Sequence, residues 1–211
     1  MKYLYNPPAI LKKTFGSFKW VTSNGKILFT FDDGPTAKGK ETMLKLLNEN
    51  KIKATFFCVG NNIKNYPALA GNILNEGHLI GNHTFNHKKL TESSYTESIN
   101  EINSVTLLLK DKFDYDTKYF RPPYGKYKLG MASLLKKCGL TNVMWSLLTY
   151  DFEGDFNKVK FATEKYLRRD SIVVLHDNLK SSEIICESIK FVLDEANKKG
   201  FEIGEPEECL K

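Results

Sequence analysis

Residues 27–35 read Ile27-Leu28-Phe29-Thr30-Phe31-Asp32-Asp33-Gly34-Pro35, an apolar run that ends in two carboxylates and a turn. A short apolar run bounded by Gly and Pro is typical of a buried β-strand. A second run, residues 172–175, leads in the same way into His176. Polar groups placed directly after buried strands indicate a sheet whose strand ends carry a functional site.

Short apolar runs alternate with amphipathic stretches from about residue 27 to the end of the chain. The strands we expect span residues 27–31, 54–59, 79–81, 119–121, 142–148, 172–176 and 201–204. Apolar residues at helical spacing predict helices over residues 36–50, 95–112 and 183–199. This alternation is typical of α/β proteins with parallel strands, and seven such units favour a closed or nearly closed barrel over an open sheet. The absence of a G-x-G-x-x-G motif after the first strand argues against a dinucleotide-binding fold.

A chain of 211 residues, 41% of them hydrophobic, is expected to form a single domain. We place this domain at residues 26–211 and a short N-terminal extension at residues 1–25. Ser23-Asn24-Gly25 separates residues 18–21 from residues 26–28, a spacing that predicts a β-hairpin. We expect this segment to add a strand or plug outside the barrel.

The composition excludes several classes of protein. Lys and Arg number 31 against 25 Asp and Glu, a net charge of +6 without long basic blocks, so we expect no nucleic-acid partner. No apolar stretch reaches the length of a transmembrane helix. A proline pair at residues 7–8 interrupts the start before the apolar core of a signal peptide can form. We therefore expect a cytoplasmic protein, with association to the cell envelope as the alternative.

The four cysteines lie far apart and form no C-x-x-C motif, which argues against a structural zinc ribbon; they are Cys58, Cys138, Cys186 and Cys209. We expect most of them to be free thiols.

His83 and His87 form an i,i+4 pair, which is a moderately specific metal signal. Alone, these histidines would equally form an exposed polar patch, and the sequence Asp-Gly-Pro after Asp32 would equally be a simple turn. Together, one carboxylate and two imidazoles suit a catalytic divalent metal. A second carboxylate and a third imidazole, His176, would then supply a base and an acid. His78 has no evident partner, and we assign it a structural role.

Arg121 precedes Pro122-Pro123-Tyr124-Gly125. An arginine here would, on its own, pair with a surface acid, but two consecutive prolines stiffen the loop and suit a site that needs fixed geometry. Trp145 is either a core residue or a substrate contact, and the sequence favours neither.

These motifs together resemble the polysaccharide deacetylase family, also called the NodB homology domain or carbohydrate esterase family 4. The resemblance runs from about residue 26 to residue 204 and is carried, in order, by residues 30–35, 83–87, 121–125, 145–151 and 175–176. It implies a distorted (β/α)7 barrel and a hydrolase of linear amides. Such an enzyme removes N-acetyl or O-acetyl groups from an acetylated carbohydrate such as chitin or peptidoglycan.

The resemblance also implies a role for each matching residue. Asp33, His83 and His87 match the ligands of a divalent metal, usually zinc, with cobalt or another divalent ion as alternatives. Asp32 matches the general base and Arg121 its partner, while His176 matches the general acid and Asp151 the carboxylate that supports it. The substrate side is matched by the backbone N–H of Tyr124 for the oxyanion, by Leu175 as a wall of the acetyl pocket, and by Pro123 and Trp145.

One motif departs from the family pattern. Phe152 follows Asp151 where many members have Trp, and Leu148 stands where an acidic residue is common. These changes leave the catalytic assignment intact but put substrate details taken from Asp-Trp members in doubt.

Three alternative readings remain at this stage. Two histidines and one carboxylate also describe non-haem iron oxygenases, although Asp32, Arg121 and His176 would then have no role. A non-catalytic glycan-binding barrel is the second alternative, but it predicts damage to the acid or the base. The third is a deacylase of a lipid-linked sugar or of a small-molecule amide.

Overall fold

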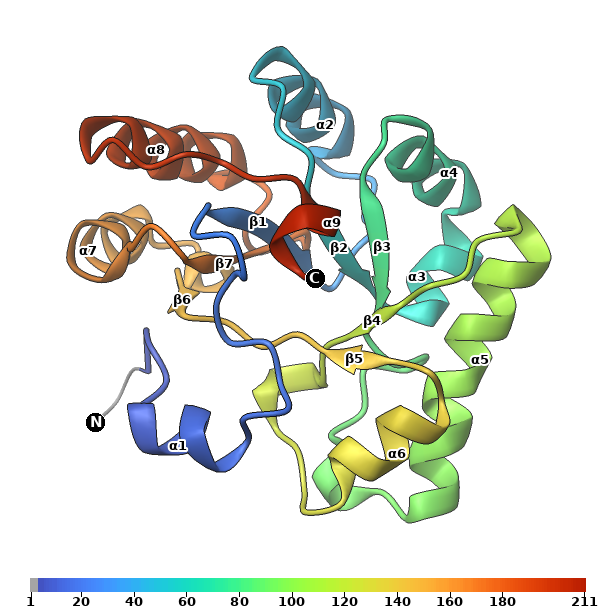
Figure 1. Ribbon diagram of the computed structural model, residues 1–211. Helices are drawn as coiled ribbons and strands as arrows, with labels where there is room; N and C mark the ends of the chain where they lie inside the picture. The colour runs from blue at the N-terminus through green and yellow to red at the C-terminus, as the bar shows by residue number, and fades with distance from the viewer. Residues whose placement is uncertain (1–3) are drawn as a thin grey trace.

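The computed structural model describes residues 4–211 as a curled sheet of seven parallel strands surrounded by helices (Figure 1). The strands follow the order β5-β4-β3-β2-β1-β7-β6, so the sheet is open between β5 and β6. Their bounds are β1 Leu28–Asp32, β2 Thr55–Cys58, β3 Leu79–Asn82, β4 Tyr119–Phe120, β5 Thr141–Asn142, β6 Leu147–Leu148 and β7 Ile172–His176. The expected α/β fold, a distorted seven-unit barrel, is confirmed.

Both faces of the central strands are buried, which explains why they are apolar runs rather than alternating patterns. In β1, Phe29 and Phe31 belong to a large apolar cluster that also contains residues of the surrounding helices. Leu28 belongs to a second cluster with Phe57 and Phe120. Because side chains alternate along a strand, Thr30 and Asp32 share the face of Leu28. The last inward position of β1 therefore carries a carboxylate.

Helices connect all successive strands except β5 and β6, which follow each other without a helix between them. Their bounds are α1 Ala9–Thr14, α2 Lys40–Glu49, α3 Gly60–Asn65, α4 Pro67–Asn75, α5 Tyr95–Phe113, α6 Met131–Lys137, α7 Phe156–Tyr166, α8 Ile185–Lys198 and α9 Pro206–Cys209. Short 3-10 turns are η1 Leu90–Glu92, η2 Pro123–Gly125 and η3 Asp151–Glu153. Helix α5 begins with a complete capping box between Ser94 and Glu97, which fixes its first residue. No helix among residues 4–211 is long and apolar enough to cross a membrane.

Two of the expected strands differ from the prediction. The segment 142–148 is not one strand: it contains the last residue of β5, a break, and then the whole of β6. The break arises because the carbonyls of Val143 and Met144 accept hydrogen bonds from Arg121 at 2.8 Å each. The segment 201–204 shrinks to a single bridge between Ile203 and Ile27. Hydrogen bonds to a side chain thus replace part of a strand that apolar content alone would predict.

The expected N-terminal hairpin does not form. Lys19 and Val21 bridge to Val143 and Ser171, whereas the other arm bridges to Ile203 through Ile27. The chain still bends at residues 23–25. The first arm therefore runs from the segment after β5 to the residue before β7 (Figure 1), where its backbone forms hydrogen bonds with Asn142, Met144 and Asp170.

Gly81 on β3 leaves room for Phe57, its direct neighbour on β2. A Cβ atom on Gly81 would lie 2.5 Å from the Phe57 ring. Gly81→Ala should therefore lower the free energy of unfolding by about 1–3 kcal/mol through overpacking. Urea denaturation measures the change. Gly16→Ala is the control, since Gly16 is exposed and a Cβ atom there would lie 3.5 Å from the Lys13 carbonyl oxygen, an ordinary contact. Equal stability of the two variants would contradict the tight packing.

Candidate active site

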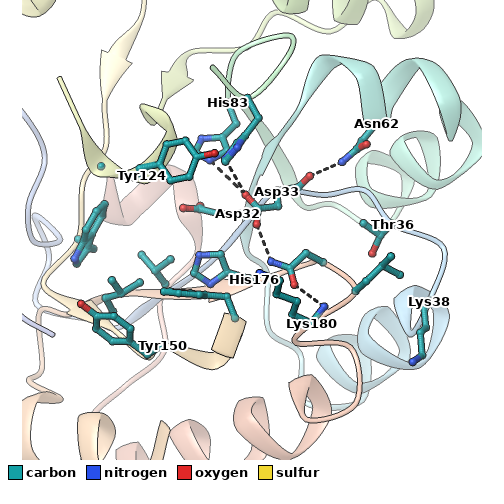
Figure 2. Close-up of a pocket in the computed structure, with 18 of the residues that line it drawn as sticks. Asp32, Asp33, Thr36, Lys38, Asn62, His83, Tyr124, Tyr150, His176 and Lys180 are labelled. Carbon is teal, nitrogen blue, oxygen red and sulfur yellow. Dashed lines mark hydrogen bonds and ion pairs between the residues drawn. The ribbon is translucent and has the colours of Figure 1, made fainter. Parts of the chain in front are cut away.

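The carboxyl ends of β1, β3, β4, β6 and β7 converge on one cavity of about 980 Å³ (Figure 2). Its lining includes residues from all five of the sequence motifs, namely Asp32, Asp33, His83, His87, Tyr124, Gly125, Trp145 and His176. Residues far apart in the sequence thus meet because parallel strands all end at the same edge.

Asp33, His83 and His87 each offer one ligand atom, and these atoms lie within 4.8 Å of one another. Asp33 Oδ1 is 3.1 Å from His87 Nε2 and 3.7 Å from His83 Nε2. One carboxylate and two imidazoles at these separations form a set of donors that suits a divalent metal with open coordination positions. The residues present therefore fit the metal that the sequence implies.

The hydrogen bonds of this cluster orient its ligand atoms. His83 Nδ1 lies 2.7 Å from the carbonyl of Arg121, which turns Nε2 toward Asp33. Burial lowers the pKa of His83 to about 4, so its imidazole is neutral and its nitrogen can ligate. Burial tends to raise the pKa of Asp33, but the hydrogen bond from His87 and the nearby imidazoles outweigh it and hold this pKa well below its usual range.

Asp32 lies beside the three candidate metal ligands and is held by a buried arginine. Arg121 has no exposed surface, and its Nη1 donates to Asp32 Oδ1 at 2.7 Å and to Thr30 Oγ1 at 2.8 Å. Its guanidinium also stacks on Phe57, 4.1 Å from the ring centre. Burial lowers the pKa of Arg121, and Asp32 opposes this effect. The carboxylate is therefore fixed in place, with one oxygen engaged and the other on the cavity side.

His176 and Asp151 form a second hydrogen-bonded pair at the cavity. Asp151 Oδ1 lies 2.8 Å from His176 Nδ1, and Oδ2 accepts the backbone N–H of His176 at 2.7 Å. Burial alone would lower the pKa of His176, but the charge and hydrogen bond of Asp151 raise it to about 9. The imidazolium therefore persists at neutral pH. Phe152 packs edge-on against His176, with the two ring centres 4.7 Å apart.

Tyr124 and Trp145 also line the cavity. Tyr124 is 58% exposed, adopts a left-handed backbone with φ of 60°, and its ring lies 4.7 Å from that of His87. A Cβ atom on Gly125 would lie 2.1 Å from the Trp145 ring, so only glycine fits there. Pro123 is buried and does not line the cavity. It begins the rigid turn that carries Tyr124.

Leu175 does not form a wall of the cavity, contrary to expectation. On β7, Val174 and His176 line the cavity, and Leu175 packs with Phe31 in the cluster that includes the outer helices. Neighbouring residues on a strand point to opposite faces, so a residue directly before His176 cannot share its face. The period of two places Val174 at the wall instead.

Asn178 and Asn62 are site residues that the sequence analysis missed. Asn178 Nδ2 donates to Asp33 Oδ2 at 2.8 Å, and Asn62 Nδ2 donates to the Asp33 carbonyl at 2.7 Å (Figure 2). Asn178 lies two residues after His176, so the sequence offered a signal that it belongs to the site. Asn62 lies in none of the sequence motifs, and the sequence offered no such signal for it. His78 lies apart and is buried, with Nδ1 accepting the N–H of Ala54, in line with its assigned structural role.

Comparison with known proteins agrees with this geometry. A family profile described as "Polysaccharide deacetylase" matches residues 20–143. Chitin deacetylase 1 of Saccharomyces cerevisiae is 36% identical over 76% of this chain and 54% of its own length, so this chain spans about half of that relative. A peptidoglycan-N-acetylglucosamine deacetylase of Bacillus cereus is 31% identical over 93% of this chain and 94% of its own.

A comparison of folds shows the same architecture in a solved structure. The crystal structure of the Bc1960 peptidoglycan N-acetylglucosamine deacetylase covers 97% of this chain and 97% of its own, with a TM-score of 0.88 and 24% identity. From the profile match and the identities, this chain belongs to the polysaccharide deacetylase family.

Proposed function

We propose that this protein is a metal-dependent deacetylase that hydrolyses the acetamide of an N-acetylglucosamine residue in a chitin-like or peptidoglycan-like glycan. The observation that carries the proposal is the meeting of three elements at one cavity. These are a set of metal ligands, a carboxylate paired with a buried arginine, and an imidazole paired with a buried carboxylate.

The metal ligands we propose are Asp33, His83 and His87, and the ion we propose is zinc. A divalent cation held by these residues would acidify a water molecule and polarise the acetyl carbonyl. The low pKa values of Asp33 and His83 keep both side chains deprotonated, as ligation requires.

Asp32 is the proposed general base. Its hydrogen bond to Arg121 leaves the second carboxylate oxygen free to accept a proton from the attacking water. The backbone N–H of Tyr124 would stabilise the oxyanion, a role worth about 3 kcal/mol for a single donor in other enzymes. Val174 and Trp145 are the proposed apolar walls beside the acetyl methyl group.

His176 is the proposed general acid. An amine leaves only after it is protonated, and an imidazolium whose pKa is raised to about 9 is a proton donor at neutral pH. This pair favours an amide over an ester substrate, because an alkoxide needs protonation less than an amine does. It also favours hydrolysis over an iron oxygenase reaction, in which the acid and base would have no role.

Acetate release tests the proposed function directly. Zinc- or cobalt-loaded protein should release acetate from N-acetylchitooligosaccharides or from peptidoglycan fragments, and acetylated xylan tests the ester alternative. Asp32→Asn should bind metal normally and lower kcat by about 100-fold or more, because Asn keeps an oxygen for Arg121 but cannot accept the proton. Release that survives this substitution would reject Asp32 as the base, and no release from any glycan would reject the proposed activity.

His87→Ala should remove one of the three ligands and abolish stoichiometric metal binding. His87 is partly exposed, so the substitution should leave the fold intact. Elemental analysis after dialysis measures the metal content, and circular dichroism checks folding. His78→Ala is the histidine control, since His78 lies outside the cluster and should not alter the metal content. A full equivalent of metal in His87→Ala would contradict the ligand assignment.

Asp151→Asn should move the alkaline limb of the pH profile of kcat/KM to lower pH. The acid must be protonated, so activity is present below the pKa of His176 and is lost as the pH rises through it. Asp151 raises this pKa to about 9, and the neutral amide would remove that contribution. An unchanged limb in Asp151→Asn would mean that another group is the acid.

A further inference from the structure

Lys40 is a buried lysine that the proposed mechanism does not use. It is the first residue of α2 and has no exposed surface. Lysine is rarely buried, and a cation is unfavourable at the N-terminus of a helix, where the helix dipole is positive. Two unfavourable features at one position indicate that a specific partner holds Lys40 there.

That partner is Asp177, the residue that follows the proposed acid His176. Lys40 Nζ contacts Asp177 Oδ2, and both side chains are buried. Lys40 also lies over the Phe56 ring, 4.8 Å from its centre. The pair therefore joins the start of α2 to the loop after β7, two segments that are far apart in the sequence.

Asp177 also contacts the loop that carries the metal ligand Asp33. Its backbone N–H donates to the Asp32 carbonyl at 2.8 Å, and its Oδ1 accepts the Thr36 hydroxyl at 3.0 Å. A Cβ atom on Gly34 would lie 1.9 Å from Asp177 Oδ2, so the carboxylate fills the space inside this turn. Asp177 thus occupies the inside of the turn directly after Asp33.

The turn needs such a support because Asp33 adopts a left-handed backbone with φ of 77°. A non-glycine residue in this region is strained and persists only where the surroundings hold it. The neighbouring loop adds the hydrogen bond from Asn178 to Asp33 Oδ2. Movement of Asp177 would therefore displace the carboxylate of Asp33 relative to His176.

We propose that Lys40 is a positioning residue, which acts through Asp177 to fix the metal ligand Asp33 and the acid His176 relative to each other. This inference rests on the proposed deacetylase function for its kinetic consequence. Lys40 touches neither the cavity nor the ligand cluster. Its role is to hold together the β1–α2 and β7–α8 loops.

The test compares Lys40→Met with the double variant Lys40→Met/Asp177→Asn. Lys40→Met should lower kcat at least roughly 10-fold with KM nearly unchanged, because small misplacements of reacting groups slow the chemical step more than binding. It should also weaken Co²⁺ binding, measured by competition with a chelator. The single variant leaves a lone buried carboxylate and should be less stable. The double variant should recover thermal stability but not kcat or metal affinity.

Lys45→Met is the matched control, since Lys45 lies on the same helix with its side chain 76% exposed. It should change neither kinetics nor metal affinity. Recovery of both kcat and stability in the double variant would show that the pair only balances buried charge, and would overturn the proposal. So would a Lys40→Met protein with unaltered kcat and metal affinity. If the unmodified protein releases no acetate, the proposed function fails, and metal affinity alone then decides the role of Lys40.

Discussion

The buried guanidinium of Arg121 is the interaction on which the rest of the site depends. It donates to Asp32 and to the carbonyls of Val143 and Met144, while the carbonyl of Arg121 itself orients His83. One residue thus fixes the proposed base, one metal ligand and the break in the sheet between β5 and β6. Removing it would leave a buried carboxylate and two carbonyls without partners, a change that is strongly destabilising in buried ion pairs.

Two histidines of the site differ in protonation because their surroundings differ. His83 and His176 are both largely buried, yet the pKa of one falls to about 4 and that of the other rises to about 9. The difference follows from Asp151, which bonds directly to His176. A neutral imidazole suits a metal ligand and a charged one suits a proton donor. Burial and a single carboxylate therefore suit the two histidines to their proposed roles, metal ligand for His83 and general acid for His176.

Sequence patterns were most reliable where one local rule decides the structure. The strand 172–176 and the three expected helices were predicted to within a few residues, because apolar periodicity reports directly on burial. Patterns failed where a distant group changes the backbone. The hairpin at Ser23-Asn24-Gly25 gave way to pairing with Val143 and Ser171, and the segment 142–148 broke in two around Arg121. Leu175 was misplaced by one position, an error that the period of two in a strand corrects.

The sequence by itself determined the fold class and the residue types at the ends of the strands, because burial of apolar runs and the chemistry of Asp and His are local properties. Tertiary structure alone decided which groups meet and in which protonation state. Asn62 and Asn178 reach Asp33 only through folding, and Lys40 meets Asp177 across 137 positions of the chain. Contacts of this kind depend on the parallel order of β1 and β7, which places their carboxyl ends side by side and which no single segment specifies.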